Sequence, residues 1–144
     1  MEPGELFDEW LEDAVYRDKQ VDRDGVHLTV GQVSRLEARG SIDFGGGELE
    51  QAPATAIEPV KRDPADDYGW WNLRPGAYVV TFNESVRDGA PPLLLVTNNR
   101  LLSCGCAIAP IVLSGGRVRS VLTVADHGVA IKENARAALL RPVG

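Results

Sequence analysis

The chain has little of what a membrane-spanning, secreted or metal-rich protein needs. Its 144 residues include only two cysteines, and no apolar run approaches the length of a membrane-spanning helix. Met1 is followed by the acidic segment EPGELFDEW rather than by a basic and then apolar signal peptide. We therefore expect a cytoplasmic protein in a reducing compartment, with no membrane partner.

The two cysteines, Cys104 and Cys106, are separated by one residue. In a strand, residues i and i+2 face the same side, so the two thiols would be neighbours. A metal site would need further ligands, and only His27 and His127 could add imidazoles. Because no CxxC pair or ligand-rich spacing is present, we predict no metal site and interpret both cysteines as small buried side chains.

Basic charge is also scarce. The formal net charge is −6 and the isoelectric point is about 4.9, so the chain lacks the basic surface with which proteins bind nucleic acid phosphates. A nucleic acid polymer is therefore excluded as the expected partner. The mass of 15.6 kDa is that of one ordinary domain with its own core, and we predict a single domain over residues 1–144.

The first 20 residues carry a helical pattern. Apolar residues recur three or four positions apart, which is typical of one face of an amphipathic helix; they are Phe7, Trp10, Leu11, Ala14 and Val15. Pro3 and the acids that follow favour a helix start. We predict one N-terminal amphipathic helix within residues 1–20, docked on the rest of the fold.

The remainder of the sequence favours strands. Val26, Leu28 and Val30 alternate with polar residues, residues 32–40 fit a helical turn or a bend, and residues 45–67 are loop-rich with a short strand near 56–57. From Trp70 onward six apolar runs follow: GAYVVTFNESV, PPLLLVTNN, CAIAPIVL, RVRSVLTVA, GVAI and ARAALLRPV. The turn DHG before GVAI favours a tight hairpin. A mainly β fold, a barrel or a sandwich, is predicted.

Several segments resemble the archaeal branch of the dUTPase and dCTP deaminase superfamily. They are GVHLTV, GSIDF, LRPGAYVVTFNESV, NRLLSCGCAI and HGVAIKENARAALL, in that order and with similar spacing. The resemblance implies a distorted β-barrel or jelly roll that forms a homotrimer, with a deoxynucleotide ligand at the subunit interfaces. It also implies a carboxylate that activates water, acidic residues that hold Mg²⁺, and a serine motif that contacts the phosphates.

This sequence departs from the family's motifs at the positions that carry chemistry. His27 stands where the strand motif has an acid, and Asn98, Asn99 and Arg100 stand where the family has an arginine and two serines. Ser114 is nearest to the position of the catalytic carboxylate, and Leu139 replaces the phosphate-side glutamine. The deaminase branch carries a glutamate in the strand that corresponds to RSVLTV, which has none.

Acidic residues are few in the second half of the chain. After Asp88 only Asp126 and Glu133 remain, whereas metal-assisted hydrolysis needs several converging oxygen ligands and a base. We therefore predict no catalytic and no metal-binding residues. The candidate nucleotide-binding residues are Asn98, Asn99, Arg100, Ser103, Ser114, Gly115, Gly116 and Arg136.

Some residues of this sequence also have a purely structural interpretation. The segment TNNR also has the composition of an exposed polar turn between two strands. Arg117 and Arg119 share one face of a strand, as an anion contact or as protection of a solvated edge. Trp70 and Trp71 cannot both be core residues, so we expect one under the N-terminal helix and the other at a subunit contact.

Three functional hypotheses follow. The first is a trimeric dUTPase-like protein without pyrophosphatase or deaminase activity, acting as a structural or nucleotide-binding module that needs no cofactor. The second is an active dUTP diphosphatase that uses Mg²⁺ and a shifted active site, with acids such as Asp43 donated by a neighbouring subunit. In the third, the chain forms a mixed trimer with a catalytically complete paralogue.

Overall fold

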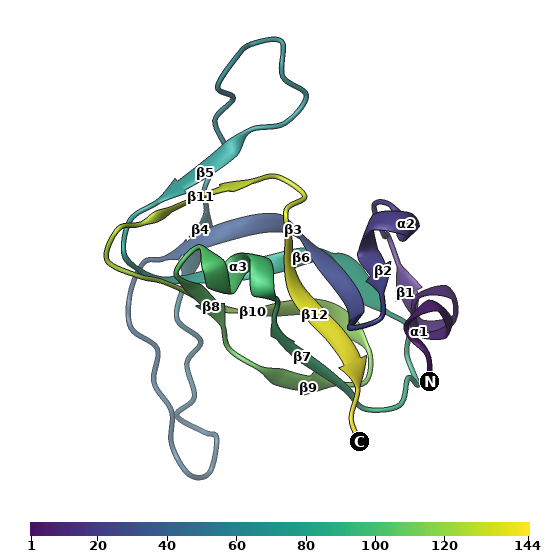
Figure 1. Ribbon diagram of the computed structural model, residues 1–144. Coiled ribbons are helices and arrows are strands. Elements are labelled where there is room, and N and C mark those ends of the chain that lie inside the picture. The colour runs from purple at the N-terminus through teal and green to yellow at the C-terminus, as the bar shows by residue number, and fades with distance from the viewer.

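The computed structural model describes all 144 residues and is mainly β. The elements, in chain order, are α1 (Pro3–Trp10), β1 (Leu11–Glu12), α2 (Arg17–Gln20), β2 (Val21–Asp22), β3 (Gly25–Leu36), β4 (Ala54–Ala56), β5 (Trp70–Leu73), β6 (Gly76–Val86), β7 (Leu93–Thr97), α3 (Asn99–Ser103), β8 (Cys106–Ile108), β9 (Ile111–Leu113), β10 (Gly116–Val124), β11 (Val129–Lys132) and β12 (Arg136–Pro142) (Figure 1). No helix is long and apolar enough to cross a membrane.

Most strands belong to one curled sheet. Its order is β8-β10-β6-β3-β12-β7-β9, with β1 added to β6 and both β2 and β4 added to β3. β5 and β11 form a separate two-stranded sheet beside it (Figure 1). The main sheet curls into a half-barrel, which confirms the predicted mainly β, barrel-type fold.

The two longest strands, β3 and β6, form the centre of the sheet and pair with each other in antiparallel fashion. Along β6 every second side chain is buried, from Tyr78 through Val80, Phe82 and Glu84 to Val86. Alternation of this kind follows from the period of two in a strand, which sends the other set of side chains outward. The apolar members of the buried set join one hydrophobic core of 25 residues.

The prediction of one helix within residues 1–20 is wrong in its extent. α1 ends at Trp10, Leu11 pairs with Val86 of β6, and the chain turns at Asp13 with a positive φ of 62° before α2 begins. Strand pairing satisfies the backbone of Leu11, so the helix gains nothing by continuing there. The buried helical side chain is Leu6, whereas Val15 of the predicted stripe is 49% exposed.

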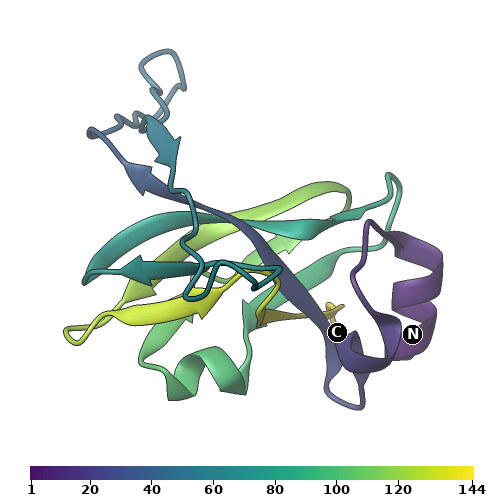
Figure 2. The same ribbon diagram turned by 90° about the horizontal axis from the view of Figure 1, so that it is seen from above.

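A projecting arm separates β3 from β4. β3 continues through Leu36, where a helical turn or bend was expected, because it pairs with β6 and then with β4. The expected strand near 56–57 is β4, one to two residues earlier. Residues 37–53 leave the sheet as a long excursion, which we call the arm (Figure 2). Within the segment SIDF only Ser41 forms a bridge, to Glu50.

Two further strand predictions need correction. The run CAIAPIVL is not one strand but two, because Pro110 lacks an N–H group and interrupts the ladder between β8 and β9. β8 then pairs with β10, and β9 with β7. The turn through Gly128 exists, with φ 69°, but the strands on either side do not form a hairpin, because β11 pairs with β5.

The cysteines and tryptophans also differ from expectation. Cys104 is exposed at the end of α3 and Cys106 is buried in β8, so the thiols do not share a strand face. Trp71 is buried and donates its indole N–H to the carbonyl of Ile57 at 2.8 Å. β5, which carries both tryptophans, lies at the other end of the molecule from α1 (Figure 1), so neither packs under that helix.

Candidate functional site

A polar cleft lies between α3, β12 and the turn that joins β2 to β3. Its volume is about 250 Å³, and we call it the α3 cleft. It is lined by Asp24, His27, Thr97, Asn98, Asn99, Arg100, Leu139 and Arg141. The tertiary structure thus brings together His27, the TNNR segment and Leu139, which are positions where the sequence departs from the family's motifs.

Asn98 organises the start of α3. Its side-chain Oδ1 accepts a hydrogen bond from the N–H of Leu101 at 3.0 Å, and its Nδ2 donates to the carbonyl of Arg136 at 2.9 Å. The residue is 2% exposed. Within TNNR, Asn99 and Arg100 are exposed, but Asn98 is a buried helix cap that ties α3 to β12, so the interpretation as an exposed polar turn fails at Asn98.

His27 connects the cap to an acidic turn. Its Nε2 lies 2.7 Å from Oδ2 of Asp22, and its Nδ1 lies 3.2 Å from Nδ2 of Asn98. Because Oδ1 of Asn98 already accepts from a backbone N–H, its Nδ2 must donate, which leaves Nδ1 of His27 as the acceptor and the ring proton on Nε2. Both ring nitrogens are occupied, so His27 holds neighbouring groups in place and is not free to act as a base.

The carboxylate of Asp22 is held in its charged form. Burial opposes ionisation, but the N–H of Asp24, which donates at 2.8 Å, and the ring of His27 together lower its pKa below the ordinary value. The carboxylate of Asp22 is thus engaged by hydrogen bonds to the ring of His27 and to the N–H of Asp24 in the turn. Asp24, the next acid along the chain, is the one carboxylate among the residues that line the α3 cleft.

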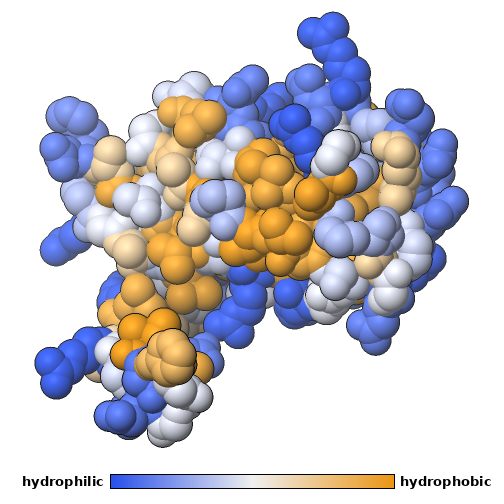
Figure 3. Space-filling model, turned by 90° about the horizontal axis from the view of Figure 1, so that it is seen from below, coloured by the Kyte–Doolittle hydropathy of each residue, from blue (hydrophilic) through white to orange (hydrophobic).

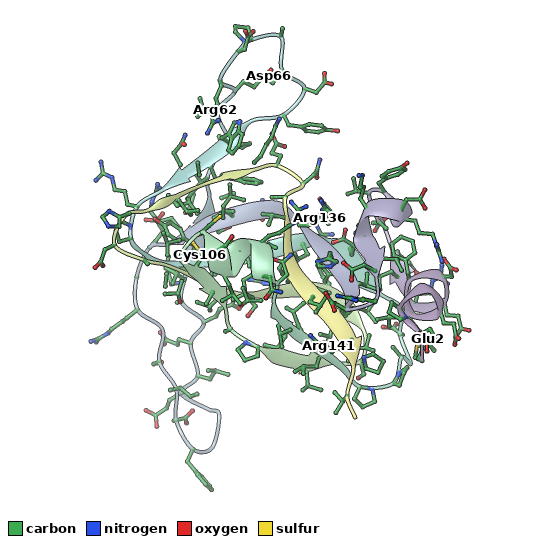
Figure 4. All side chains as sticks on the ribbon, in the orientation of Figure 1. Glu2, Arg62, Asp66, Cys106, Arg136 and Arg141 are labelled. Carbon is green, nitrogen blue, oxygen red and sulfur yellow. The ribbon has the colours of Figure 1, made fainter.

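Two arginines give the cleft its positive charge. Arg100 of α3 and Arg141 of β12 are exposed, and neither has a carboxylate partner within ion-pair distance. Arg136, also on β12, is directed elsewhere, because its guanidinium donates to the carbonyl of Lys19 at 2.7 Å. The side chains of Arg136 and Arg141 lie apart along β12 (Figure 4). The cleft therefore presents two unpaired guanidinium groups against one carboxylate.

The remaining predicted residues lie outside the cleft. Ser103 donates its hydroxyl to the carbonyl of Arg100 at 2.6 Å, at the far end of α3. Ser114 and Gly115 form the turn between β9 and β10, and Gly116 begins β10; a Cβ on Gly115 would lie 3.1 Å from the carboxylate of Asp88. Of the eight candidates, the structure brings only Asn98, Asn99 and Arg100 into the α3 cleft.

Sequence reasoning missed Asp22, Asp24 and Arg141. The signal that could have found the acids is the segment VDRDG, an acidic turn directly before the strand that carries His27. A search for acids after Asp88 does not reach this segment, whereas pairing between β3 and β12 brings the start of β3 beside the C-terminal strand. Arg141 shows no sequence pattern that separates it from other exposed strand arginines.

A second missed feature is a buried carboxylate in β6. Glu84 is fully buried and accepts hydrogen bonds from the N–H and hydroxyl of Thr29, at 2.9 and 2.6 Å, and from the amide of Gln20 at 2.8 Å. Burial raises the pKa of Glu84, and these hydrogen bonds offset part of that effect. The group is fully satisfied and does not line the α3 cleft, so its role is to join α2, β3 and β6.

A larger cavity of about 390 Å³ lies on the other side of α3, between that helix and the β11–β12 connection. Arg100 lines both spaces, but the larger one is walled mostly by apolar groups, with Trp70, Leu101 and Ile131 among them. The smaller cleft is lined by polar side chains with the one apolar exception of Leu139. We therefore take the α3 cleft, not the larger cavity, as the candidate functional site.

The resemblance implies Mg²⁺, and the donor set of the α3 cleft does not fit it. Magnesium takes oxygen ligands in near-octahedral geometry and is usually held by more than a single carboxylate. Here Asp24 is the one free carboxylate, Asp22 is bound to His27, and no group of three or more His, Cys, Asp or Glu side chains is placed to hold a metal ion. Asp43 lies on the arm, where its carboxylate accepts from the N–H groups of Gly46 and Glu48.

Comparison with known proteins places the chain in a family. No family model matches it. A probable deoxyuridine 5'-triphosphate nucleotidohydrolase of Methanosarcina mazei is 31% identical over 134 residues, which cover 88% of this chain and 73% of that protein. This chain belongs to the dUTPase and dCTP deaminase superfamily. Proteins of the same description from Methanosarcina acetivorans and Methanosarcina barkeri are 31% and 28% identical over the same length.

A solved structure supports the fold of this superfamily member. The crystal structure of 2'-deoxycytidine 5'-triphosphate deaminase from Agrobacterium tumefaciens matches 94% of the chain with a TM-score of 0.62. The sequence identity is 12%, and the match covers 44% of that longer chain. At this identity the likeness establishes the shared β architecture and nothing about activity.

Proposed function

We propose that this member of the dUTPase and dCTP deaminase superfamily binds the phosphate groups of a deoxynucleotide in the α3 cleft and does not hydrolyse them. The observation that carries the proposal is the charge of the cleft, where Arg100 and Arg141 stand unpaired against Asp24. Counted over the residues that line the cleft, two guanidinium groups and one carboxylate leave one positive charge, and the carboxylate of Asp22 beside them is engaged by His27. An anionic ligand fits that balance.

The physical basis of binding is the guanidinium group. Arginine presents several N–H donors in a planar fork that matches the oxygens of a phosphate. Arg100 lies on α3, next to the buried cap of Asn98, and Arg141 lies on β12. Asn99 adds an exposed amide, and Leu139 forms an apolar wall. Because Asn98 also bonds to β12, it fixes the spacing between the elements that carry the two arginines.

Hydrolysis requires a general base and several metal ligands, and the cleft contains only some of these groups. Attack of water on a phosphorus needs a base within hydrogen-bond reach and metal ligands that converge on the phosphates. His27 has both ring nitrogens engaged, and Asp24 alone would have to serve as base and as metal ligand. A binding module therefore accounts for the residues of the cleft better than a hydrolase built from one chain.

A second candidate function is an active dUTP diphosphatase. The relatives described as probable nucleotidohydrolases favour it, and so does Asp24, which lines the cleft, with Asp22 hydrogen-bonded to His27 of the cleft wall. In that case Mg²⁺ and at least one further carboxylate would have to come together at a contact between subunits of a homotrimer. A mixed trimer with a catalytically complete paralogue would meet the same need.

The test measures binding and turnover on the same preparation. Binding of dUTP and dCTP is measured by calorimetry with and without Mg²⁺, and pyrophosphate release is followed in parallel. We expect binding without release above background. Arg141→Ala should weaken binding at least tenfold, whereas the matched variant Arg117→Ala, which removes an exposed arginine outside the cleft, should leave it unchanged.

Two outcomes contradict the proposal. Pyrophosphate release that Asp24→Asn abolishes would establish the diphosphatase instead. A protein that neither binds nor turns over either nucleotide would exclude both candidates and leave a structural role.

A further inference from the structure

The larger cavity on the other side of α3 follows the course of β11. Residues 129–137, which are β11 and its connection to β12, line it without a break. Arg100 and Leu101 of α3, with Cys104 at the end of that helix, form the opposite wall. Figures 1 and 2 both show β11 between β5 and α3. We call this space of about 390 Å³ the β11 groove.

β11 has one paired edge and one open edge. It pairs with β5 and with no other strand. In an antiparallel pair, alternate residues direct both of their backbone groups toward the partner strand, and the residues between them direct both away. Trp70 of β5, which lies opposite Lys132, forms its backbone hydrogen bonds with Val60 instead, at 2.8 and 2.9 Å. Lys132 therefore belongs to the set that is directed away from β5.

Ala130 belongs to the same set, because it lies two residues before Lys132. The carbonyl of Lys132 accepts from the N–H of Ala135 at 3.0 Å, but no strand pairs with the N–H groups of Ala130 and Lys132 or with the carbonyl of Ala130. Both residues are exposed and line the β11 groove. An open strand edge of this kind is a template on which another extended segment can pair.

The charged side chains of the β11 groove are mostly positive. They are Arg100, Lys132 and Arg136 against Glu133. Neither Arg100 nor Lys132 has a carboxylate within ion-pair distance, and the carboxylate of Glu133 accepts from the N–H of Gly69 at 2.8 Å. Positive charge around a binding groove favours an acidic partner and selects against a basic one.

The two faces of β11 differ in polarity. Ile131 is 4% exposed and belongs to the core, whereas Ala130 and Lys132 on the other face are exposed. A segment that pairs with β11 as the next strand would share these two faces, because side chains alternate with a period of two. One set of its side chains would lie beside Ile131 and the apolar wall of the groove, and the other set beside Lys132. An alternation of apolar and acidic residues fits both faces.

Exposed apolar side chains alone do not identify a partner, because they are common on folded proteins. An apolar tract crosses the face of the molecule seen from below (Figure 3), and β9, whose Val112 is 63% exposed, lies on that side. The β11 groove combines its apolar wall with an open strand edge and unpaired cations. These two further features specify the conformation and the charge of the segment that would bind there.

We propose that the β11 groove binds an extended segment of another protein, in which apolar and acidic residues alternate, by adding it as a strand to β11. Main-chain hydrogen bonds to Ala130 and Lys132 give the affinity, and the cations of the groove select the charge. The proposal does not depend on whether the α3 cleft binds a nucleotide. Lys132 does not line that cleft, so the two sites can be tested by different variants.

The test uses the full chain and three synthetic peptides. The first is a short peptide of alternating glutamate and valine, and the second has lysine in place of glutamate. The third is the first with two prolines at its centre, because proline lacks the N–H group that strand pairing needs. Fluorescence anisotropy of the labelled peptides measures their affinities. We expect the first peptide to bind about tenfold more tightly than either of the others.

A matched pair of variants places the peptide on the protein. Lys132→Glu reverses one charge of the groove and should weaken binding of the glutamate peptide by about tenfold. Arg117→Glu makes the same reversal at an exposed site outside the groove and should leave binding unchanged. In NMR-detected hydrogen exchange, the amides of Ala130 and Lys132 should gain protection when the glutamate peptide is bound. Circular dichroism verifies that both variants fold.

Four outcomes overturn the proposal. The first is a glutamate peptide that does not bind at millimolar concentration, and the second is equal binding of the proline peptide, which would indicate attraction by charge alone. The third is protection gained away from β11, and the fourth is binding that Lys132→Glu leaves unchanged. A failure of nucleotide binding is distinguishable from these outcomes, because it is measured with nucleotides and Arg141→Ala at the α3 cleft.

Discussion

Three buried polar side chains, Gln20, Glu84 and Asn98, join elements that are far apart in the sequence. Gln20 accepts from the N–H groups of Val15 and Tyr16 and donates to the carbonyl of His27 and to Glu84. Every buried side-chain nitrogen or oxygen in the chain has a hydrogen-bond partner. A buried polar group costs free energy when a partner is lost, so these residues fix the arrangement of the surrounding elements.

Glu84 should make stability depend on pH in a recognisable direction. Because its pKa is raised above 4.5, the folded protein retains the proton while the unfolded chain releases it. The contribution of Glu84 is therefore fully present below pH 4.5 and is lost as pH rises through the folded pKa. The free energy of unfolding of the wild type, minus that of Glu84→Gln, should fall as pH rises from 4.5 to 7. Urea unfolding at several pH values measures it, and a difference that grows with pH would contradict the assignment.

Asn98 should be essential to stability because it caps α3 and bonds to β12. Asn98→Ala should lower the free energy of unfolding by about 1–3 kcal/mol, since a cap and a buried hydrogen bond are lost together. Asn98→Asp keeps the cap but places a carboxylate oxygen against the carbonyl of Arg136, so it should also destabilise the protein. Asn99→Ala, at an exposed neighbour, should be nearly neutral. Urea unfolding compares the three variants, and a neutral Asn98→Asp would show that the amide donor is dispensable.

At the scale of elements, the N-terminal segment shows how a helical pattern is overridden. Its apolar side chains are shared between α1, which contributes Leu6, and β1, which contributes Leu11, because pairing with β6 uses residues 11–12 as a strand. The intrinsic preference of a segment for helix is weaker than the tertiary contacts that compete for it.

The N-terminal correction makes a matched pair of variants informative. Leu6→Ala should destabilise the protein by about 2–5 kcal/mol, because Leu6 is fully buried in the core. Val15→Ala should change stability by less than about 0.5 kcal/mol, although Val15 belongs to the apolar stripe of the sequence. Thermal or urea unfolding gives both values. A larger loss of stability in Val15→Ala than in Leu6→Ala would instead support the predicted helix through residue 15.

At the scale of the whole molecule, hydrogen bonding is concentrated in the centre of the main sheet. β6 pairs with both β3 and β10 over most of its length, whereas β5 and β11 pair with no other strand, and β5 has one further bridge, from Trp70 to Val60. Backbone groups paired on both sides within a packed core open only when the whole domain unfolds. The described core is one cluster, and the organisation of residues 1–144 as a single domain stays a prediction.

Hydrogen exchange should rank the elements by how completely their backbone groups are paired. Amides of β3 and β6 should exchange most slowly, those of β5 and β11 faster, and those of the arm fastest. The exceptions in the arm are the bonded N–H groups of Glu37, Ser41, Gly46, Glu48, Leu49 and Glu50. Mass spectrometry or NMR of the exchanging protein measures the ranking. Exchange in β5 and β11 as slow as in β6 would show that the small sheet is part of the same cooperative unit.

Much of the fold could be predicted from the sequence. The period of two in GVHLTV and in the run from Gly76 to Val86 identified β3 and β6, and the glycines and prolines of residues 45–67 identified a loop-rich segment. These signals are local, since a strand with one buried face records its burial in alternate residues. Part of the candidate site was also predictable, because Asn98, Asn99 and Arg100 are adjacent in sequence and lie together in the cleft.

By itself, the sequence determined the mainly β class, the family and the TNNR segment of the site, because alternation and adjacent motif residues are local properties. Only the tertiary structure decided that β12 pairs with β3, which places Arg141 and Asp24 beside α3, and that Asn98 is buried rather than exposed. The physical reason is that strand pairing joins residues more than a hundred positions apart. The register of such pairs depends on how the whole core packs, not on any neighbouring residue.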